Sequence, residues 1–396
     1  MAKKIPLREL CSMEITDGTH KTPTYSEEGY IFLSSKNVTT GKINWKDVMY
    51  IPEELHNELY KRIAPQKDDI LLAKNGTTGI AAIVDRDETF DIYVSLALVR
   101  PDKEKVLPRY LLHAINSEPS KKFFNEHLKG IGVPNLHLTH IRETPISVPN
   151  FSKQKEIVEK LDKIDELISC RKEQLLKLDE LVKARFVEMF GDPTDNPMRW
   201  DRVNISMVVS GKVSNGFFAK RDDYSDEGNV KVLGVAHVVN RMYSNIENLP
   251  ATNGTETDVV KYGVKYGDML FCRSSLVAAG IGKASIVPKN APNNVLFECH
   301  VIRLPLDLGK CVPEFMQVLS TTDYFRNQVI SQSKTATMTT IGQEGILKTD
   351  IILPPLELQK QFFQFVEEAE NTKAEVQKSL DELEILKKSL MQKYFG

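Results

Sequence analysis

The chain has 396 residues, 41% of them hydrophobic and 27% charged, which is enough for two cores of ordinary domain size. Its net charge of −2 excludes nucleic-acid binding through a high overall positive charge, and no apolar run approaches the ~20 residues that span a bilayer. The N-terminus lacks a signal-peptide core, and the five cysteines show no CxxC spacing. We therefore expect a cytoplasmic protein with reduced thiols.

Residues 1–151 are the first predicted globular domain, in which strands and helices are separated by glycine and proline. Runs of β-branched and aromatic residues predict strands, and apolar periodicity predicts helices. The expected strands cover 30–33, 69–72, 79–84, 92–99 and 146–148, and the expected helices cover 109–115 and 120–128.

Residues 152–191 predict one long helix that ends at Gly191. Its apolar residues recur at alternating steps of four and three, interrupted by Arg171, which is the period of a coiled coil. Such a narrow apolar seam cannot be buried by one helix alone, so a partner helix is required. The seam residues are Ile157, Leu161, Ile164, Ile168, Leu175, Leu178 and Val182.

Residues 356–396 repeat this helix at an offset of 205, which places Gln154 on Gln359 and Phe190 on Phe395. Because the chain reads globular region, helix, globular region, helix, the second helix is expected to return antiparallel along the first. Arg171 and Lys373, which lie within the apolar pattern, are either contacts for docking partners or side chains that extend their charge to water, and we favour the second interpretation. The matching seam is Phe362, Val366, Ala369, Val376, Leu380, Leu383 and Leu390.

Residues 192–355 repeat the element order of the first domain with little sequence identity. Strands are expected at 230–239, 267–273 and 280–287, and 312–315 corresponds to 107–110. The predicted fold class is α+β, with two pseudo-symmetric mixed α/β domains separated by two long helices that pair as an antiparallel coiled coil.

The sequence shows no convincing active site. It has no Gly-x-Gly-x-x-Gly after a strand, no Walker motif and no Asn/Asp-Pro-Pro-aromatic segment. The carboxylates at 67–69 and 192–195 fit ordinary turns, and His137 and His140 lack the glutamate of a zinc protease. We therefore predict a binding protein with no catalytic or metal-binding residues.

The candidate binding residues lie in loops, where lysine and arginine occur with serine, threonine and asparagine. These side chains contact phosphates and base edges in DNA, although solvated turns have the same composition. Basic and acidic residues are balanced, at 20 each in 1–151 and 17 each in 192–355, so DNA binding requires the basic ones to gather on one face. The predicted contacts are Thr19, His20, Lys21, Ser35, Lys36, Lys74, Asn75, Thr77, Asn215, Lys220, Arg221, Arg273, Ser274, Lys334 and Thr337.

Over essentially its whole length the chain resembles the specificity (S) subunits of type I restriction–modification systems. The resemblance rests on DGTHKTP at 17–23, on KDDILLAKNGTTG at 67–79 with YGDMLFCRSS at 266–275, and on the proline-led helices beginning at 149 and 354. The twofold repetition in this order is the specific feature. One local departure is Pro149-Asn150-Phe151, where the second helix has Pro354-Pro355-Leu356.

The resemblance implies two target recognition domains, each reading half of an asymmetric bipartite DNA site. The chain itself would be non-catalytic and would dock two modification (methyltransferase) subunits and the restriction (endonuclease/translocase) subunits. S-adenosylmethionine, ATP and Mg would then be bound by those partners, with no cofactor in this chain.

Two alternatives remain open from the sequence. The chain could be a coiled-coil scaffold whose terminal domains bind proteins, which the balanced charge of both domains allows. It could also be the recognition subunit of a fused restriction and methyltransferase system.

Overall fold

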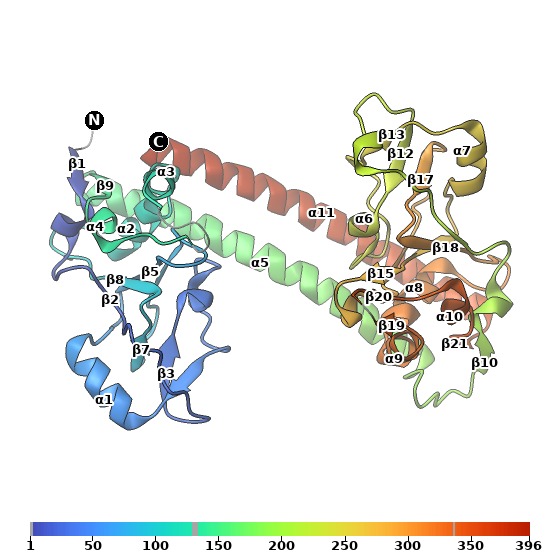
Figure 1. The fold of residues 1–396 in the computed structure, drawn as a ribbon, viewed down its shortest axis with the longest axis horizontal. Helices are drawn as coiled ribbons and strands as arrows, with labels where there is room; N and C mark the ends of the chain where they lie inside the picture. Colours follow the sequence, from blue (N-terminus) through green and yellow to red (C-terminus); the bar gives the residue numbers. More distant parts are fainter. Residues whose placement is uncertain (1–2, 129–133, 336) are drawn as a thin grey trace. The chain divides into compact units, whose positions relative to one another are not determined.

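The structure is a computed structural model that describes residues 3–128, 134–335 and 337–396. The chain divides into two compact units, and each unit contains one globular region and one end of each of two long helices (Figure 1). The long helices are α5 (Phe151–Phe190) and α11 (Leu356–Phe395). Unit 1 comprises Met1–Lys172 and Lys378–Gly396, and unit 2 comprises Glu173–Gln377.

The globular region of unit 1 is built from short strands and short helices. Its strands are β1 (Lys3–Pro6), β2 (Thr16–Asp17), β3 (Tyr30–Leu33), β4 (Met49–Ile51), β5 (Ile70–Ala73), β6 (Ala81–Ile83), β7 (Phe90–Ile92), β8 (Leu96–Val99) and β9 (Pro145–Val148). Its helices are η1 (Leu7–Leu10), η2 (Ser35–Val38), α1 (Glu53–Arg62), α2 (Pro108–Ile115), α3 (Glu118–Glu126) and α4 (Leu138–Arg142).

Three sheets organise this region. An antiparallel sheet has the order β2-β8-β5-β6, a second sheet has the order β4-β3-β7 with β3 and β7 parallel, and β1 pairs antiparallel with β9. Side chains of β5 alternate between two cores, because successive residues of a strand point to opposite faces. Ile70 and Leu72 pack towards α2 and the long helices, whereas Leu71 and Ala73 pack towards the β4-β3-β7 sheet.

Unit 2 is built in the same way. Its strands are β10 (Asp201–Asn204), β11 (Ser214–Asn215), β12 (Val230–Leu233), β13 (Ala251–Thr252), β14 (Asp268–Cys272), β15 (Ser274–Ser275), β16 (Ala284–Ile286), β17 (Val295–Phe297), β18 (Val301–Pro305), β19 (Lys334–Thr335), β20 (Thr339–Thr340) and β21 (Asp350–Leu353). Its helices are η3 (Ile205–Val208), η4 (Arg221–Asp223), α6 (Val235–Val238), α7 (Glu256–Tyr262), η5 (Ala278–Gly280), α8 (Pro313–Thr321), α9 (Asp323–Ser331) and α10 (Gln343–Leu347).

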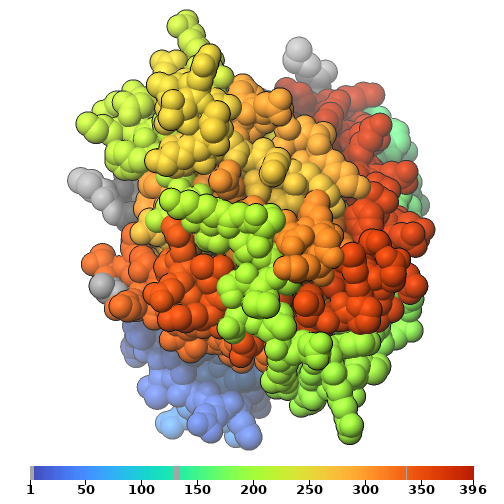
Figure 2. All heavy atoms as spheres, turned by 90° about the vertical axis from the view of Figure 1, so that its right-hand side faces the viewer, coloured from blue at the N-terminus to red at the C-terminus, as the bar shows by residue number. Residues whose placement is uncertain are grey.

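The sheets of unit 2 have the same pairing order as those of unit 1. They are β11-β18-β14-β16, β13-β12-β17 with β12 and β17 parallel, and β10 with β21. Unit 2 also has a small sheet of order β15-β20-β19. In the space-filling view, segments far apart in the sequence interleave on one face of unit 2 (Figure 2).

Two predicted strands are wrong in their extent. Residues 92–99 form the end of β7, a turn and then β8, because the Leu96 amide donates to the Tyr93 carbonyl (2.9 Å) and closes the turn. Residues 230–239 form β12 and then α6. The Gly234 amide there donates to Nδ1 of His237 (3.1 Å), and burial lowers the pKa of His237, which favours the neutral ring that this bond requires.

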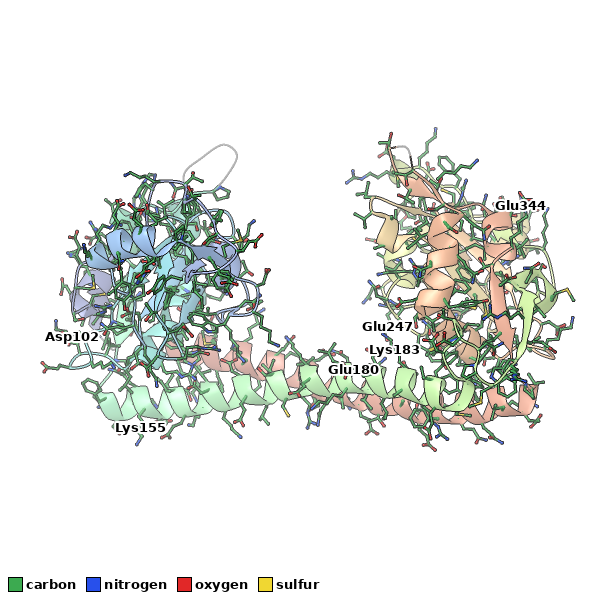
Figure 3. The ribbon with its side chains drawn as sticks, turned by 90° about the horizontal axis from the view of Figure 1, so that it is seen from below. Asp102, Lys155, Glu180, Lys183, Glu247 and Glu344 are labelled. Carbon is green, nitrogen blue, oxygen red and sulfur yellow. The ribbon has the colours of Figure 1, made fainter. Side chains whose placement is uncertain are left out.

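The long helices are amphipathic along their whole length, and every predicted seam residue is buried or half-buried. In each unit the contacts between them are those of antiparallel segments. Lys387 pairs with Asp165 (2.5 Å) and Lys172 with Glu384 (3.0 Å) in unit 1, and Lys373 pairs with Asp179 (2.7 Å) in unit 2. Charged side chains occupy the exposed faces, as the labelled Lys155, Glu180 and Lys183 of α5 illustrate (Figure 3).

A buried glutamine fixes the first turn of each long helix to its own unit. In unit 1, Oε1 of Gln154 accepts from the Leu107 amide (2.8 Å) and its Nε2 donates to the Pro149 carbonyl (2.9 Å). In unit 2, Oε1 of Gln359 accepts from the Val312 amide (2.9 Å) and its Nε2 donates to the Pro354 carbonyl (2.7 Å). The amide side chain thus ties the start of each long helix to the start of α2 or α8.

Glu314 is a fully buried carboxyl of unit 2. It lies in the first turn of α8, and its Oε1 accepts from the hydroxyls of Tyr243 (2.9 Å) and Tyr266 (3.0 Å). Burial raises the pKa of Glu314 above its ordinary value of 4.5, although these hydrogen bonds and the charge of Lys289 oppose the shift. Glu314 therefore binds its proton more tightly in the folded than in the unfolded chain.

This shift predicts how Glu314→Gln changes stability with pH. Because the folded pKa lies above the unfolded value, the wild type loses stability as pH rises from about 4.5 through the folded pKa. Glutamine does not titrate, so the variant should gain stability relative to the wild type over this window, as measured by urea unfolding at a series of pH values. Glu344→Gln, on an exposed side chain of the same unit, is the control. A difference between Glu314→Gln and wild type that is constant with pH would contradict the prediction.

Candidate nucleic-acid interface

In unit 1 the predicted contact residues lie in three loops that a single turn binds together. The loops follow β2, β3 and β5, and the turn is residues 93–95 between β7 and β8. The amide of Val94, at the centre of this turn, donates to the Thr19 carbonyl (3.0 Å). Oγ of Ser95 accepts from the Ser35 amide (2.9 Å). The Lys74 amide donates to the Ser95 carbonyl (2.9 Å). The structure therefore brings the three predicted loops to one place.

In unit 2 the segment 298–300 makes the corresponding connections. The Glu298 amide donates to the Leu233 carbonyl (2.9 Å), and the carboxylate of Glu298 accepts from the Val235 amide (3.0 Å). The Arg273 amide donates to the His300 carbonyl (2.8 Å), as Lys74 does to Ser95 in unit 1. The loops after β12 and β14 are thus joined in the same manner.

Two equivalent glycines allow the first loop of each unit to reach this position. A Cβ at Gly18 would lie 1.9 Å from the Ile92 carbonyl oxygen, and one at Gly216 would lie 2.2 Å from that of Phe297. Both distances are far inside van der Waals contact, so any side chain would force the loop away from the end of its neighbouring strand. Glycine is required here by the close approach of two backbones.

Asp17 in the unit 1 loops lies close to three basic side chains. Its carboxylate lies 3.0 Å from Nζ of Lys74, 3.3 Å from Nε2 of His20 and 3.9 Å from Nη2 of Arg62. The side chains of Asp17 and Lys74 are each only 8% exposed, so Lys74 forms a buried ion pair that joins the first loop to the third. Arg62 also donates to the carbonyls of Asp17 and Gly18. Direct DNA contact by Lys74 stays a prediction.

The other predicted residues of unit 1 differ in exposure. The Lys21 side chain is 88% exposed, Lys36 and Thr77 are exposed, and Thr19 is buried. Asn75 is half-buried and forms an isolated antiparallel β-bridge with Asn135. Within the described residues, Oδ1 of Asn75 and Oδ1 of Asn135 have no hydrogen-bond partner.

In unit 2 a small sheet brings together candidates from two distant segments. Ser274 of β15 and Lys334 of β19 both pair with Thr340 of β20. Arg273, just before β15, donates from Nη1 to the Cys299 carbonyl (3.2 Å), and Thr337 is exposed in the turn after β19.

The remaining candidates of unit 2 follow the close approach at Gly216. Asn215 is half-buried in β11. Lys220 and Arg221 are exposed at the separate turn η4, where the Lys220 amide donates to Asp223 (2.7 Å).

A cleft of about 540 Å³ lies in unit 2 between α8 and the long helices. Lys373 lines it, with its ammonium group 2.7 Å from Asp179 and 2.8 Å from Glu370. Burial lowers the pKa of Lys373, but these two hydrogen bonds outweigh it and raise the pKa overall. The Lys373 side chain is 21% exposed, and its ammonium group is paired with the carboxylate of Asp179, which is 54% exposed. In unit 1, Arg171 donates from Nε to Oγ of Ser379 (3.2 Å).

Among the described residues, no group of three or more histidine, cysteine, aspartate or glutamate side chains is arranged to hold a metal ion. No helix of the described chain combines the length and the apolar character needed to cross a membrane.

Sequence reasoning missed several residues that build these sites. Asp17 lies within the DGTHKTP segment but its pairing with Lys74 and Arg62 depends on distant strands. The segment 93–95 lies within the predicted strand 92–99, and 298–300 lies in a stretch for which no element was predicted. The offset of 205 places Ser95 on His300 and was the one signal that could have marked them as equivalent.

The comparisons with known proteins agree with this architecture. Residues 3–180 match the family model of the type I restriction modification DNA specificity domain. The EcoKI specificity subunit of Escherichia coli (strain K12) is 20% identical, and the alignment covers 94% of this chain and 83% of that protein. The StySPI specificity subunit of Salmonella potsdam is 22% identical with the same coverage.

Two solved structures share the fold. The S subunit of a type I restriction–modification system from M. genitalium aligns with a TM-score of 0.58 at 12% identity, covering 100% of this chain and 96% of that one. A chain from a structure of type I system assembly and conformational transition aligns with a TM-score of 0.52 at 18% identity, covering 99% and 97%.

The mixed α/β fold and the matched segment define the class, because residues 3–180 belong to the type I restriction modification DNA specificity domain family. Over nearly its whole length the chain is a relative of type I restriction enzyme specificity subunits, so the resemblance seen in the sequence is confirmed. The prediction that it is a specificity subunit, and not the catalytic part of such an enzyme, is confirmed as well.

The ion pair between Asp17 and Lys74 gives a testable prediction. Asp17→Asn leaves a buried ammonium group without its carboxylate, which should lower the free energy of unfolding by about 3–5 kcal/mol. Adding Lys74→Met removes the unpaired charge, so the double variant should recover part of this loss. Chemical denaturation of the single and double variants measures both effects. Equal stability of Asp17→Asn and the double variant would show that the ion pair carries no such role.

Proposed function

We propose that residues 1–151 and 192–355 are two target recognition domains, each of which reads half of an asymmetric bipartite DNA site. The observation that carries the proposal is the gathering of the three predicted loops of unit 1 by residues 93–95, together with the matching hydrogen bonds by which residues 298–300 of unit 2 join the segments after β12 and β14. The same frame thus presents a set of loops twice. The loops differ in sequence, which is what reading two unlike half-sites requires.

The two long helices are proposed to form one antiparallel coiled coil that relates the two domains by pseudo-symmetry. The antiparallel contacts within each unit and the matching glutamines support this view. Helix α5 has 40 residues, which corresponds to about 60 Å of helix. At about 3.4 Å per base pair this sets an upper scale of roughly 18 base pairs for the distance between half-sites.

The long helices also carry apolar side chains that neither unit covers. Leu176, Leu181 and Val187 of α5 are 65%, 50% and 50% exposed, and Ile385 of α11 is 70% exposed. Exposed apolar surface of this kind marks protein–protein contact. We propose that two modification (methyltransferase) subunits and the restriction (endonuclease/translocase) subunits dock on the chain. S-adenosylmethionine, ATP and Mg would then be bound by these partners.

The first test is methylome sequencing of cells that carry this chain, with and without its gene. A split adenine-methylated motif that disappears on deletion is the expected result, because only the specificity subunit would choose the site. The motif supplies the target for binding assays with the assembled complex, whose DNA affinity should fall steeply with salt. Absence of any such motif, together with absence of salt-dependent DNA binding, would favour a protein-binding scaffold.

The spacer role gives a second test. Inserting seven residues at matching positions in α5 and α11 keeps the apolar seam in register and lengthens each helix by about 10 Å. The methylated motif should then show a longer gap between unchanged half-sites. As a control, seven exposed residues added to the loop at 307–310 should leave the gap unchanged. An unaltered gap in the helix variant would refute the spacer role.

A further inference from the structure

Unit 2 carries four consecutive exposed apolar residues at the tip of one loop. They are residues 276–279, between β15 and the end of η5. Leu276 is 82% exposed and Val277 is 64% exposed. The next two residues, Ala278 and Ala279, are exposed as well. A run of this kind on a surface is unfavourable in water and therefore calls for a function.

The tip is held in place by its own hydrogen bonds. The Val277 amide donates to Oγ of Ser275 (3.3 Å), and the Gly280 amide donates to the Val277 carbonyl (3.0 Å). Arg326 of α9 donates from Nη2 to the Ala279 carbonyl (3.1 Å). Leu276 and Val277 are therefore presented to solvent by an ordered turn, so a partner would bind them without ordering the loop first.

The surface around this tip is polar and basic. Arg273 precedes β15, and the adjoining β19 and β20 carry exposed Lys334, Thr335 and Thr340. In DNA, lysine and arginine contact phosphates or guanine, and hydroxyls contact either kind of base edge. An apolar tip in a basic, hydroxyl-rich setting complements DNA better than it complements an apolar protein surface.

The equivalent loop of unit 1 has a different chemistry. It reads Asn75-Gly76-Thr77-Thr78, which is polar throughout. Because the two frames match and this tip changes from polar to apolar, the apolar contact would be made at one half-site alone.

We propose that Leu276 and Val277 contact thymine 5-methyl groups in the major groove of the half-site read by residues 192–355. The inference rests on the proposed function and adds a specificity-determining contact to it. The thymine methyl is the one apolar group that a base pair presents in the major groove, and branched aliphatic side chains match it. Leu276 and Val277 thereby favour an A·T pair at a fixed position of that half-site.

The test uses the full chain assembled with its partner subunits, and duplexes of the motif found by methylome sequencing. Each thymine of the half-site is replaced in turn by uracil, which lacks only the methyl group. For the wild type, one or two replacements should weaken binding by roughly fourfold each, the effect of one buried methyl group. Leu276→Ser with Val277→Ser should bind the natural duplex correspondingly more weakly and should be indifferent to those replacements.

The control is Val260→Ser, which alters an 86% exposed valine on α7 of the same unit and should behave as wild type. All variants change exposed residues, and thermal unfolding confirms that each is folded. Wild-type affinity that is insensitive to every uracil, or a half-site without an A·T pair, overturns the inference while leaving the proposed function intact. Wild-type complex that shows neither a motif nor DNA binding fails the proposed function itself.

Discussion

Each core is completed by helix ends that lie far apart in the sequence. In unit 1, Ile157 and Leu161 at the start of α5 are joined by Phe395 at the end of α11, whose ring lies 5.5 Å from that of Tyr110. In unit 2, Phe186 near the end of α5 packs 5.6 Å from Phe362 at the start of α11. Neither core closes until the last helix of the chain is in place, so folding of both units depends on contacts of long sequence separation.

The start of each long helix is held in place on its unit by hydrogen bonds. A glutamine that is buried in each unit uses both ends of its side-chain amide, so it cannot rotate without leaving buried polar groups unpaired. The helix direction is therefore set by hydrogen bonds from the globular region, while the apolar seam sets only which face is buried. Direction and face together give the helices a defined register within each unit.

The candidate interface is built on this frame but is chemically separate from it. Residues 93–95 and 298–300 bind the loops through backbone groups and two side-chain oxygens, so the outward-pointing side chains can change without disturbing the hydrogen bonds. Gly18 and Gly216 are exceptions because the backbone itself needs the space, and Asp17 and Lys74 are exceptions because their buried ion pair joins the first loop to the third. Exposed side chains of these loops can therefore be substituted while the fold is preserved.

The sequence by itself determined the two long helices, their seams and the order of the two globular regions, because periodicity and the 205-residue repeat are local or directly countable. It also singled out Lys36, Ser274 and Lys334 as candidate contacts, although Ser274 and Lys334 lie in the short strands β15 and β19 and not in loops. Only the tertiary structure showed that 92–99 contains a turn and that Lys74 is paired with Asp17, since an apolar run reads alike in a strand and in a tight turn, and an ion pair joins residues that no pattern connects. The meeting of Ser274 and Lys334 on Thr340 likewise required three segments to fold together.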